Sequence, residues 1–125
     1  MGQPNGQVVC IVDDDASLRR SLRNLLMSLG FRVETFSSGE AFLEATDRDR
    51  IGCLVLDVRM DGMSGVELLR RLAITGAAIP AIMLTAHSDD ETRRRSLEAG
   101  AVAFLEKPVR SDALLAAVRA ALSTA

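Results

Sequence analysis

Three aspartates stand where two apolar runs of the chain end. Residues 8–12 are followed directly by Asp13 and Asp14, and residues 53–56 are followed by Asp57. Short apolar runs closed by acids or turn-forming residues predict buried strands. In a parallel sheet both strands end at one edge, so the three carboxylates converge there. Carboxylates this close repel one another unless a cation joins them, and an all-oxygen set favours a hard divalent ion, best matched by Mg²⁺.

Two more polar side chains are predicted at the same edge. Thr85 ends the fourth apolar run, and Lys107 follows the fifth. A hydroxyl and an ammonium beside carboxylates suit phosphoryl transfer, with Asp57 as the nucleophile and Lys107 among the groups that balance charge on the phosphoryl oxygens. One aspartate at a strand end is more often a helix cap, and Asp15 is assigned that role. The combined set favours the reactive interpretation of Asp57.

The alternation of elements predicts how these residues are positioned. Apolar runs typical of strands cover residues 8–12, 31–36, 51–56, 79–84 and 101–105, and amphipathic helical segments separate them. A last helix covers residues 111–122. Because no two strands are adjacent in sequence, the fold class is α/β, with a doubly wound parallel sheet and right-handed crossovers. The common flavodoxin-like order 2-1-3-4-5 places the switch point between the first and third strands, which both end in acids.

Polar residues mark where the helices begin. The capping-box spacing, a serine three residues before a glutamate, occurs twice, in Ser37 with Glu40 and in Ser64 with Glu67. Ser88 or Asp89 is expected to cap the fourth helix. That helix contains only Leu97 as a large apolar residue, so we expect it to be loosely held.

Length and composition indicate one soluble domain over residues 7–125, with a polar head over residues 1–6 that we expect to be disordered. Apolar residues make up 48% and charged residues 26%, with no membrane-spanning run and no signal-peptide pattern. A cytoplasmic protein is therefore predicted.

The net charge of −2 disfavours a general nucleic-acid-binding surface. Cys10 and Cys53 lie in apolar runs and are predicted to be reduced core residues.

In this order and spacing, the motifs resemble the receiver domains of two-component response regulators. The likeness is carried by Ile11-Val12-Asp13-Asp14, by Leu56-Asp57-Val58-Arg59-Met60, by residues 63–69, by Thr85-Ala86-His87, and by residues 99–101 with Lys107-Pro108. It extends from residue 8 to about residue 122 and is greatest to the FixJ-type subgroup. Receivers of that subgroup are usually joined to a DNA-binding helix-turn-helix domain, which implies such an effector in a longer parent chain.

The resemblance implies a role for each acidic residue. Asp57 would accept a phosphoryl group from a histidine kinase and form an acyl phosphate. Asp14 would bind Mg²⁺ directly, Asp13 would hold it mainly through water, and Asp57 and the carbonyl oxygen of Arg59 would complete the protein ligands. The chain would then be no enzyme in the usual sense, but a phosphoacceptor that promotes its own phosphorylation and dephosphorylation.

The resemblance also implies a switch. Lys107 would contact the phosphoryl group, Thr85 would swing to hydrogen-bond it, and Phe104 would rotate inward. The surface formed by the fourth helix, fifth strand and fifth helix would change with them and could support a homodimer. The bond between Lys107 and Pro108 is usually cis in such receivers.

Two positions depart from the family pattern. Asp61 stands where Pro is common, which adds a fourth acid near the site and predicts a less ordered loop with altered Mg²⁺ affinity. Phe104 stands where Tyr is also common, so its ring cannot donate a hydrogen bond at its tip. The predicted switch would then depend on packing alone.

Other interpretations remain open at this stage. A flavin or nucleotide carrier shares the fold, but the acids after the first strand would repel a phosphate. A metal-dependent phosphatase would need a second acid where Arg59 stands, and a degenerate receiver would only bind partners. His87 is expected to affect water access at most, and residues 93–95, three arginines, are expected to form a solvated face because acids precede them.

Overall fold

The computed structural model describes residues 7–45, 50–76 and 79–123, so the predicted disordered head lies outside the described residues. Strands and helices alternate along the chain: β1 (Val8–Val12), α1 (Ala16–Ser28), β2 (Arg32–Phe36), α2 (Gly39–Glu44), β3 (Ile51–Asp57), α3 (Gly65–Ile74), β4 (Ala81–Thr85), α4 (Asp90–Glu98), β5 (Ala101–Glu106) and α5 (Ser111–Ser123). None of the helices in the described ranges is long and apolar enough to cross a membrane.

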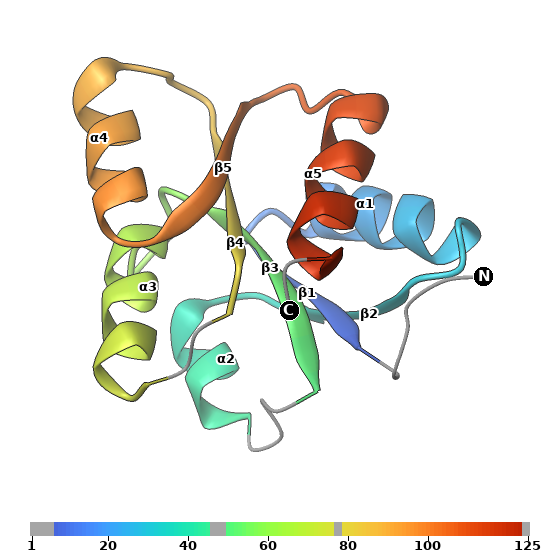
Figure 1. Cartoon of the computed structure of the whole chain (residues 1–125), viewed down its shortest axis with the longest axis horizontal. Coiled ribbons are helices and arrows are strands. Elements are labelled where there is room, and N and C mark those ends of the chain that lie inside the picture. Colours follow the sequence, from blue (N-terminus) through green and yellow to red (C-terminus); the bar gives the residue numbers. More distant parts are fainter. Residues whose placement is uncertain (1–6, 46–49, 77–78, 124–125) are drawn as a thin grey trace.

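All neighbouring strands pair in parallel, in the order β2-β1-β3-β4-β5. The predicted fold class and strand order are therefore confirmed. Helices α1 and α5 cover one face of the sheet, and α2, α3 and α4 cover the other (Figure 1). Because β1 and β3 are neighbours, their carboxyl ends meet at the switch point of the sheet.

The two faces of the sheet carry separate apolar cores, because side chains of a strand alternate between the faces. From β1, Val8, Cys10 and Val12 pack towards α2 and α3, whereas Val9 and Ile11 pack towards α1 and α5. All five are buried. A strand buried on both faces is held firmly in register, so the backbone that carries the acids at its end is well fixed.

Helix caps follow the sequence predictions with one correction. The N-cap of α2 is Ser38, whose Oγ accepts a hydrogen bond from the backbone N–H of Ala41. The prediction of Ser37 was wrong by one residue. Strand β2 extends to Phe36, and Ser37 lies between the end of this strand and the cap. This shift places Glu40 in the first turn, where its carboxylate accepts from the N–H of Met63 instead of closing a capping box.

The other predicted caps are present. Asp15 caps α1, Ser64 caps α3 and Asp89 caps α4, each through a side-chain oxygen that accepts from backbone N–H groups of the first turn. The carboxylate of Glu67 bonds Arg71 one turn later and does not return to the cap. Each such cap contributes about 1 kcal/mol to helix stability.

Helix α4 has little apolar contact with the rest of the domain. Ser96 is its one fully buried residue, and the side chain of Leu97 is 46% exposed. Its surface instead holds ion pairs of Glu91 with Arg94 and Arg95, whose side chains are more than half exposed. Exposed pairs of this kind contribute well under 1 kcal/mol each to stability. This agrees with the prediction that α4 is loosely held.

Candidate functional site

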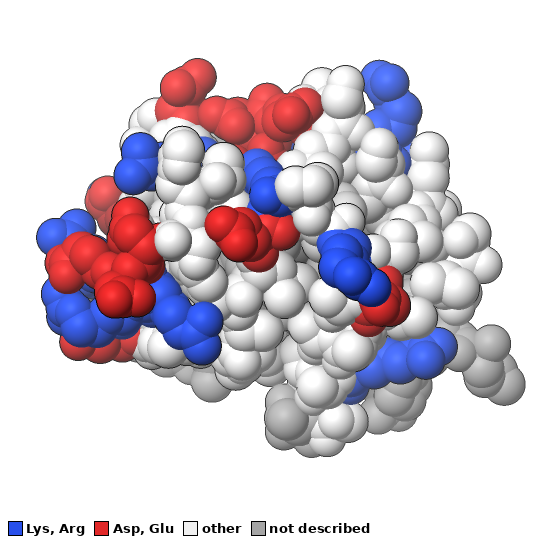
Figure 2. Space-filling view, turned by 90° about the horizontal axis from the view of Figure 1, so that it is seen from above, with Lys and Arg blue, Asp and Glu red and all other residues white. Residues whose placement is uncertain are grey.

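Three carboxylates meet at the carboxyl ends of β1 and β3. Val12 pairs with Leu56 where β1 and β3 run side by side. The acids that follow these two residues therefore lie at the same height along the sheet. Asp13, Asp14 and Asp57 each offer an oxygen, and these atoms lie within 4.8 Å of one another. Asp13 and Asp57 are buried and Asp14 is exposed. Figure 2 views this end of the molecule, and acidic side chains form one group along the top of that view and another at its left.

Lys107 reaches the same cluster from the loop after β5. Its Nζ lies 3.1 Å from Oδ2 of Asp57 and 3.3 Å from Oδ2 of Asp13. The backbone N–H of Lys107 donates to the carbonyl oxygen of Thr85 at 2.7 Å, which ties the loop to the end of β4. The bond between Lys107 and Pro108 is cis, as the resemblance implied. The predicted juxtaposition of Lys107 with the acids is therefore present.

The electrostatics of the cluster follow from burial and proximity. Burial raises the pKa of Asp13, and the nearby charge of Asp57 raises it further against the hydrogen bond from Asp15 and the pull of Lys107. Burial by itself would lower the pKa of Lys107, but hydrogen bonds and charge from Asp57 and Asp13 together outweigh it, so the pKa is raised. The lysine therefore stays protonated at neutral pH. Ionised Asp13, in contrast, costs free energy, because it is buried beside another carboxylate.

Each acid also accepts a backbone hydrogen bond that orients it. The N–H groups of Asp15, Asp61 and Arg59 donate to Asp13, Asp14 and Asp57 at 2.9, 3.0 and 3.1 Å, respectively. Each bond uses one oxygen of the carboxylate. The other oxygen of each acid is left for Lys107, a cation or a reacting group.

Thr85 ends β4 next to the cluster and is buried. Its Oγ1 donates to the carbonyl oxygen of His87 at 2.8 Å and accepts from the N–H of the same residue at 3.1 Å. The hydroxyl is thus committed to its own loop, and no hydrogen bond to the acids is found for it among the described residues. Phe104 on β5 is half-buried and packs against the core that faces α3 and α4.

The comparison with known families identifies the class of this site. The family model described as the response regulator receiver domain matches residues 9–119 of the chain. The chain is a response regulator receiver. Its relatives include the response regulator protein TodT of Pseudomonas putida, which is 44% identical over 118 residues that cover 94% of this chain and 52% of TodT. The transcriptional regulatory protein FixJ of Bradyrhizobium diazoefficiens is 41% identical over 117 residues, covering 94% and 57% of the two chains.

Solved receivers have the same fold. The crystal structure of FixJ-N superposes with a TM-score of 0.87 at 42% identity and covers 94% of both chains. The response regulator StyR superposes with a TM-score of 0.89 at 47% identity, covering 95% of this chain and 60% of StyR. The chain spans about half the length of the curated relatives that it matches. The predicted membership in the receiver family, and the likeness to FixJ, are confirmed.

Asp61 of this receiver makes a backbone hydrogen bond that was not predicted from the sequence. Its backbone N–H donates to Oδ2 of Asp14, a bond that proline could not make because it lacks an N–H. The following residues are held as well, since the N–H of Met63 donates to Glu40. These two bonds anchor the loop in the structure. The expected change in Mg²⁺ affinity stays a prediction.

Gly65 is a second residue of the receiver whose importance was not predicted. A Cβ built at this position would lie 2.3 Å from the carbonyl oxygen of Asp57 and 3.0 Å from Cε of Met83. The first turn of α3 can therefore pass directly behind Asp57 only with glycine. The sequence did contain a signal, a glycine immediately after the cap of a helix, but nothing in it indicated which backbone lay opposite.

The donor set of the receiver is suited to a hard cation. All three groups are carboxylates, and the described neighbourhood adds no thiolate or imidazole ligand to them. Three negative charges against the one positive charge of Lys107 leave two in excess, which matches a divalent ion. Asp14 is exposed, so an ion has a route from solvent. The cluster is therefore a candidate site for Mg²⁺.

Proposed function

We propose that this receiver takes a phosphoryl group from a phosphorylated histidine of a histidine kinase onto Asp57, in the presence of Mg²⁺, and that this changes the surface formed by α4, β5 and α5. The observation that carries the proposal is the position of the Lys107 ammonium, 3.1 Å from Asp57 and 3.3 Å from Asp13. Phosphoryl transfer needs a positioned oxygen nucleophile with positive charge beside it, and the cluster offers both. Under this proposal the chain is a phosphoacceptor rather than an enzyme.

In the proposed reaction a carboxylate oxygen of Asp57 attacks phosphorus while the bond from phosphorus to the histidine nitrogen breaks, and the electron pair returns to the imidazole. The N–H of Arg59 holds one oxygen of Asp57, which fixes the orientation of the carboxylate during attack. Lys107 then neutralises charge on the transferred group. Bound Mg²⁺, held by Asp13, Asp14, Asp57 and the carbonyl oxygen of Arg59, would supply further charge stabilisation for the phosphoryl oxygens.

A docking place for the kinase next to this site is supported by an apolar hollow of about 410 Å³ between α1 and the start of α5. Lys107 and Asp15 are among the residues that line it, and its apolar lining comes from Leu18, Leu22, Leu25, Pro108, Val109 and Leu114. A partner seated there would bring its histidine to the edge of the sheet where Asp57 lies. The position of the hollow thus supports the choice of phosphoryl donor.

The proposed switch begins at Thr85. A phosphoryl oxygen on Asp57 would compete for the Thr85 hydroxyl, which now donates to the carbonyl oxygen of His87. If Thr85 turns to the phosphoryl group, the loop that leads into α4 loses that bond. Helix α4 has the fewest buried residues of the described helices, and elements of low local stability move most readily. Phe104 on β5 would follow by packing into the space that Thr85 leaves.

The proposed output lies outside this chain. Since the chain spans about half of the relatives that it matches, and one of them is a transcriptional regulatory protein, we propose a DNA-binding effector domain in a longer parent protein. A homodimer through the α4-β5-α5 surface is proposed as the phosphorylated form.

The test is intact-mass spectrometry after incubation with acetyl phosphate, with and without Mg²⁺. We expect one added phosphoryl group that requires both Mg²⁺ and Asp57, so Asp57→Asn stays unmodified. Asp112→Asn, a change of the same kind on an exposed acid of α5, serves as the matched control and should be modified normally. If neither acetyl phosphate nor a phosphorylated histidine kinase modifies the unaltered chain, the proposal fails and the binding-only alternative takes its place.

A further inference from the structure

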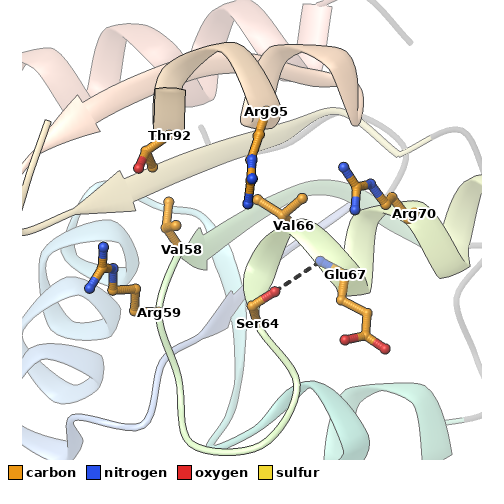
Figure 3. A pocket seen from close by; sticks show the side chains of 8 residues that line it. All are labelled: Val58, Arg59, Ser64, Val66, Glu67, Arg70, Thr92 and Arg95. Atoms are coloured by element: carbon orange, nitrogen blue, oxygen red, sulfur yellow. Dashed lines mark hydrogen bonds between the residues drawn. The ribbon is translucent and has the colours of Figure 1, made fainter. Parts of the chain in front are cut away.

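A groove between α3 and α4 is lined by three arginines from three different segments. It encloses about 310 Å³ and is lined by Val58, Arg59, Ser64, Val66, Glu67, Arg70, Thr92 and Arg95. In Figure 3, Arg95 extends from α4 towards Val66 on α3, Arg70 lies farther along α3, and Arg59 lies at the opposite end, on the loop after β3. The groove faces away from the apolar hollow that borders α1 and α5.

The arginines of the groove are only partly neutralised by the protein. Arg59 and Arg70 form no side-chain hydrogen bond or ion pair within the described part of the chain. Arg95 is paired with Glu91, which it shares with Arg94, and Arg94 has Glu98 as a second partner, so the excess charge comes from Arg59 and Arg70. The groove thus keeps an excess of positive charge.

The acids beside the groove cancel only part of this charge. Glu67, the only acid that lines the groove, is bonded to Arg71, and its carboxylate points away from α4 in Figure 3. At the other end, the pKa of Asp89 is lowered first by its hydrogen bonds with Thr92 and to a smaller degree by the charge of Arg59. That carboxylate caps α4 and also offsets part of the charge of Arg59.

The spacing of the three guanidinium groups indicates the shape of the partner. They are spread along the groove in Figure 3 and do not converge on one point, so they do not form a cradle for one compact anion. Guanidinium groups pair with carboxylates through two parallel hydrogen bonds. An extended chain with carboxylates at intervals can meet several such groups in turn, whereas a small anion can meet only one.

We propose that the groove between α3 and α4 docks an extended acidic segment of a partner protein. The carboxylates of that segment pair with Arg59, Arg95 and Arg70, and its backbone lies over Val66. This docking requires no phosphoryl transfer, so it is expected for Asp57→Asn as well. A loss of docking can therefore be told apart from a loss of the proposed phosphorylation of Asp57.

The experiment is an amide NMR titration of the full chain with hexaglutamate, with hexaglutamine as the uncharged comparison. Shifts are expected at Val58, Ser64, Val66 and Thr92 with hexaglutamate and not with hexaglutamine. Arg70→Glu should weaken binding about fivefold or more, because it replaces an attraction with a repulsion. Arg119→Glu, an exposed arginine of α5 outside the groove, is the matched control and should change the affinity by less than about twofold.

Three results would overturn the proposal. The first is an equal loss of affinity in both variants, which would indicate attraction to overall charge. The second is a set of shifts centred on a different arginine group, Arg19, Arg20 and Arg23 of α1. The third is inorganic phosphate producing the same groove shifts at the same concentration, which would indicate a compact ligand. Circular dichroism of both variants checks that each is folded, as expected for exposed side chains without ion pairs in the described structure.

Discussion

Replacing the buried acid Asp13 with asparagine should make the metal-free receiver more stable. At 1% exposure, Asp13 is ionised beside two other carboxylates, whose oxygens lie within 4.8 Å. Asparagine has nearly the same shape and its amide oxygen can keep the hydrogen bond from the N–H of Asp15. The substitution removes the charge and also replaces the oxygen that accepts from Lys107 with an NH2 group, while Lys107 keeps its contact with Asp57.

The size of the effect follows from the distances. At an effective dielectric constant of about 20, two carboxylates at the upper limit of 4.8 Å repel by about 3.5 kcal/mol, while the attraction to Lys107 at 3.3 Å is worth about 5 kcal/mol. Two repulsions exceed the one attraction by about 2 kcal/mol, although exposure of Asp14 screens part of this. The burial of the charge adds to the cost of ionised Asp13. We expect Asp13→Asn to raise the free energy of unfolding by about 1–2 kcal/mol, or Tm by about 5 °C.

The assay is thermal and urea unfolding, followed by circular dichroism in EDTA at low ionic strength. Asp112→Asn, which loses an exposed partner of Arg110, is the control and should change stability by less than about 0.5 kcal/mol. Added Mg²⁺ should stabilise the unmodified chain by about 2.7 kcal/mol at 100 times its Kd and the Asp13→Asn variant by less. An Asp13→Asn chain that is less stable than the parent without metal would refute the reasoning, because the attraction to Lys107 would then dominate.

The pH dependence has a defined sign. Burial and then Asp57 raise the pKa of Asp13 above its ordinary value of 3.8, so the folded chain binds this proton more tightly than the unfolded chain does. The penalty for ionised Asp13 is present above its folded pKa and is relieved as the pH falls through that value. The stability gap between Asp13→Asn and the parent should therefore narrow on acidification. A gap that widens would contradict the assignment.

Three further outcomes are expected. Gly65→Ala should lower the free energy of unfolding in urea by about 3 kcal/mol or more, because its Cβ would collide with the carbonyl oxygen of Asp57. Asp61→Pro should weaken Mg²⁺ binding measured by calorimetry, since it removes the N–H that orients Asp14, whereas Asp61→Ala, which retains that N–H, should bind more nearly as the parent does. Both buried cysteines, whose thiol pKa burial raises to about 12, should resist a thiol reagent at pH 8 until the chain is unfolded.

The order of elements and the position of the acids could be predicted from the sequence. Strand and helix periods are local properties of the chain, and five alternating units leave few sheet topologies once right-handed crossovers are required. The acids after β1 and β3 were assigned to one edge for this reason, and the structure places Asp13, Asp14 and Asp57 there. Lys107 was expected at the same edge and lies in contact with two of them.

Other features were decided only by tertiary structure. The cap of α2 is Ser38 rather than Ser37, since two adjacent serines offer equal local chemistry and the end of β2 selects between them. The hydrogen bond between Asp61 and Asp14 joins residues 47 positions apart, and no local pattern encodes it.

The arginine groove could not be predicted from the sequence either. It combines one residue after β3, one on α3 and one on α4, and each by itself has the pattern of an ordinary solvated side chain. A sequence specifies which side chains each element presents, because that depends on local periodicity. Which of them become neighbours depends on the angles at which packed elements cross, and those angles are set by the fit of side chains across the cores.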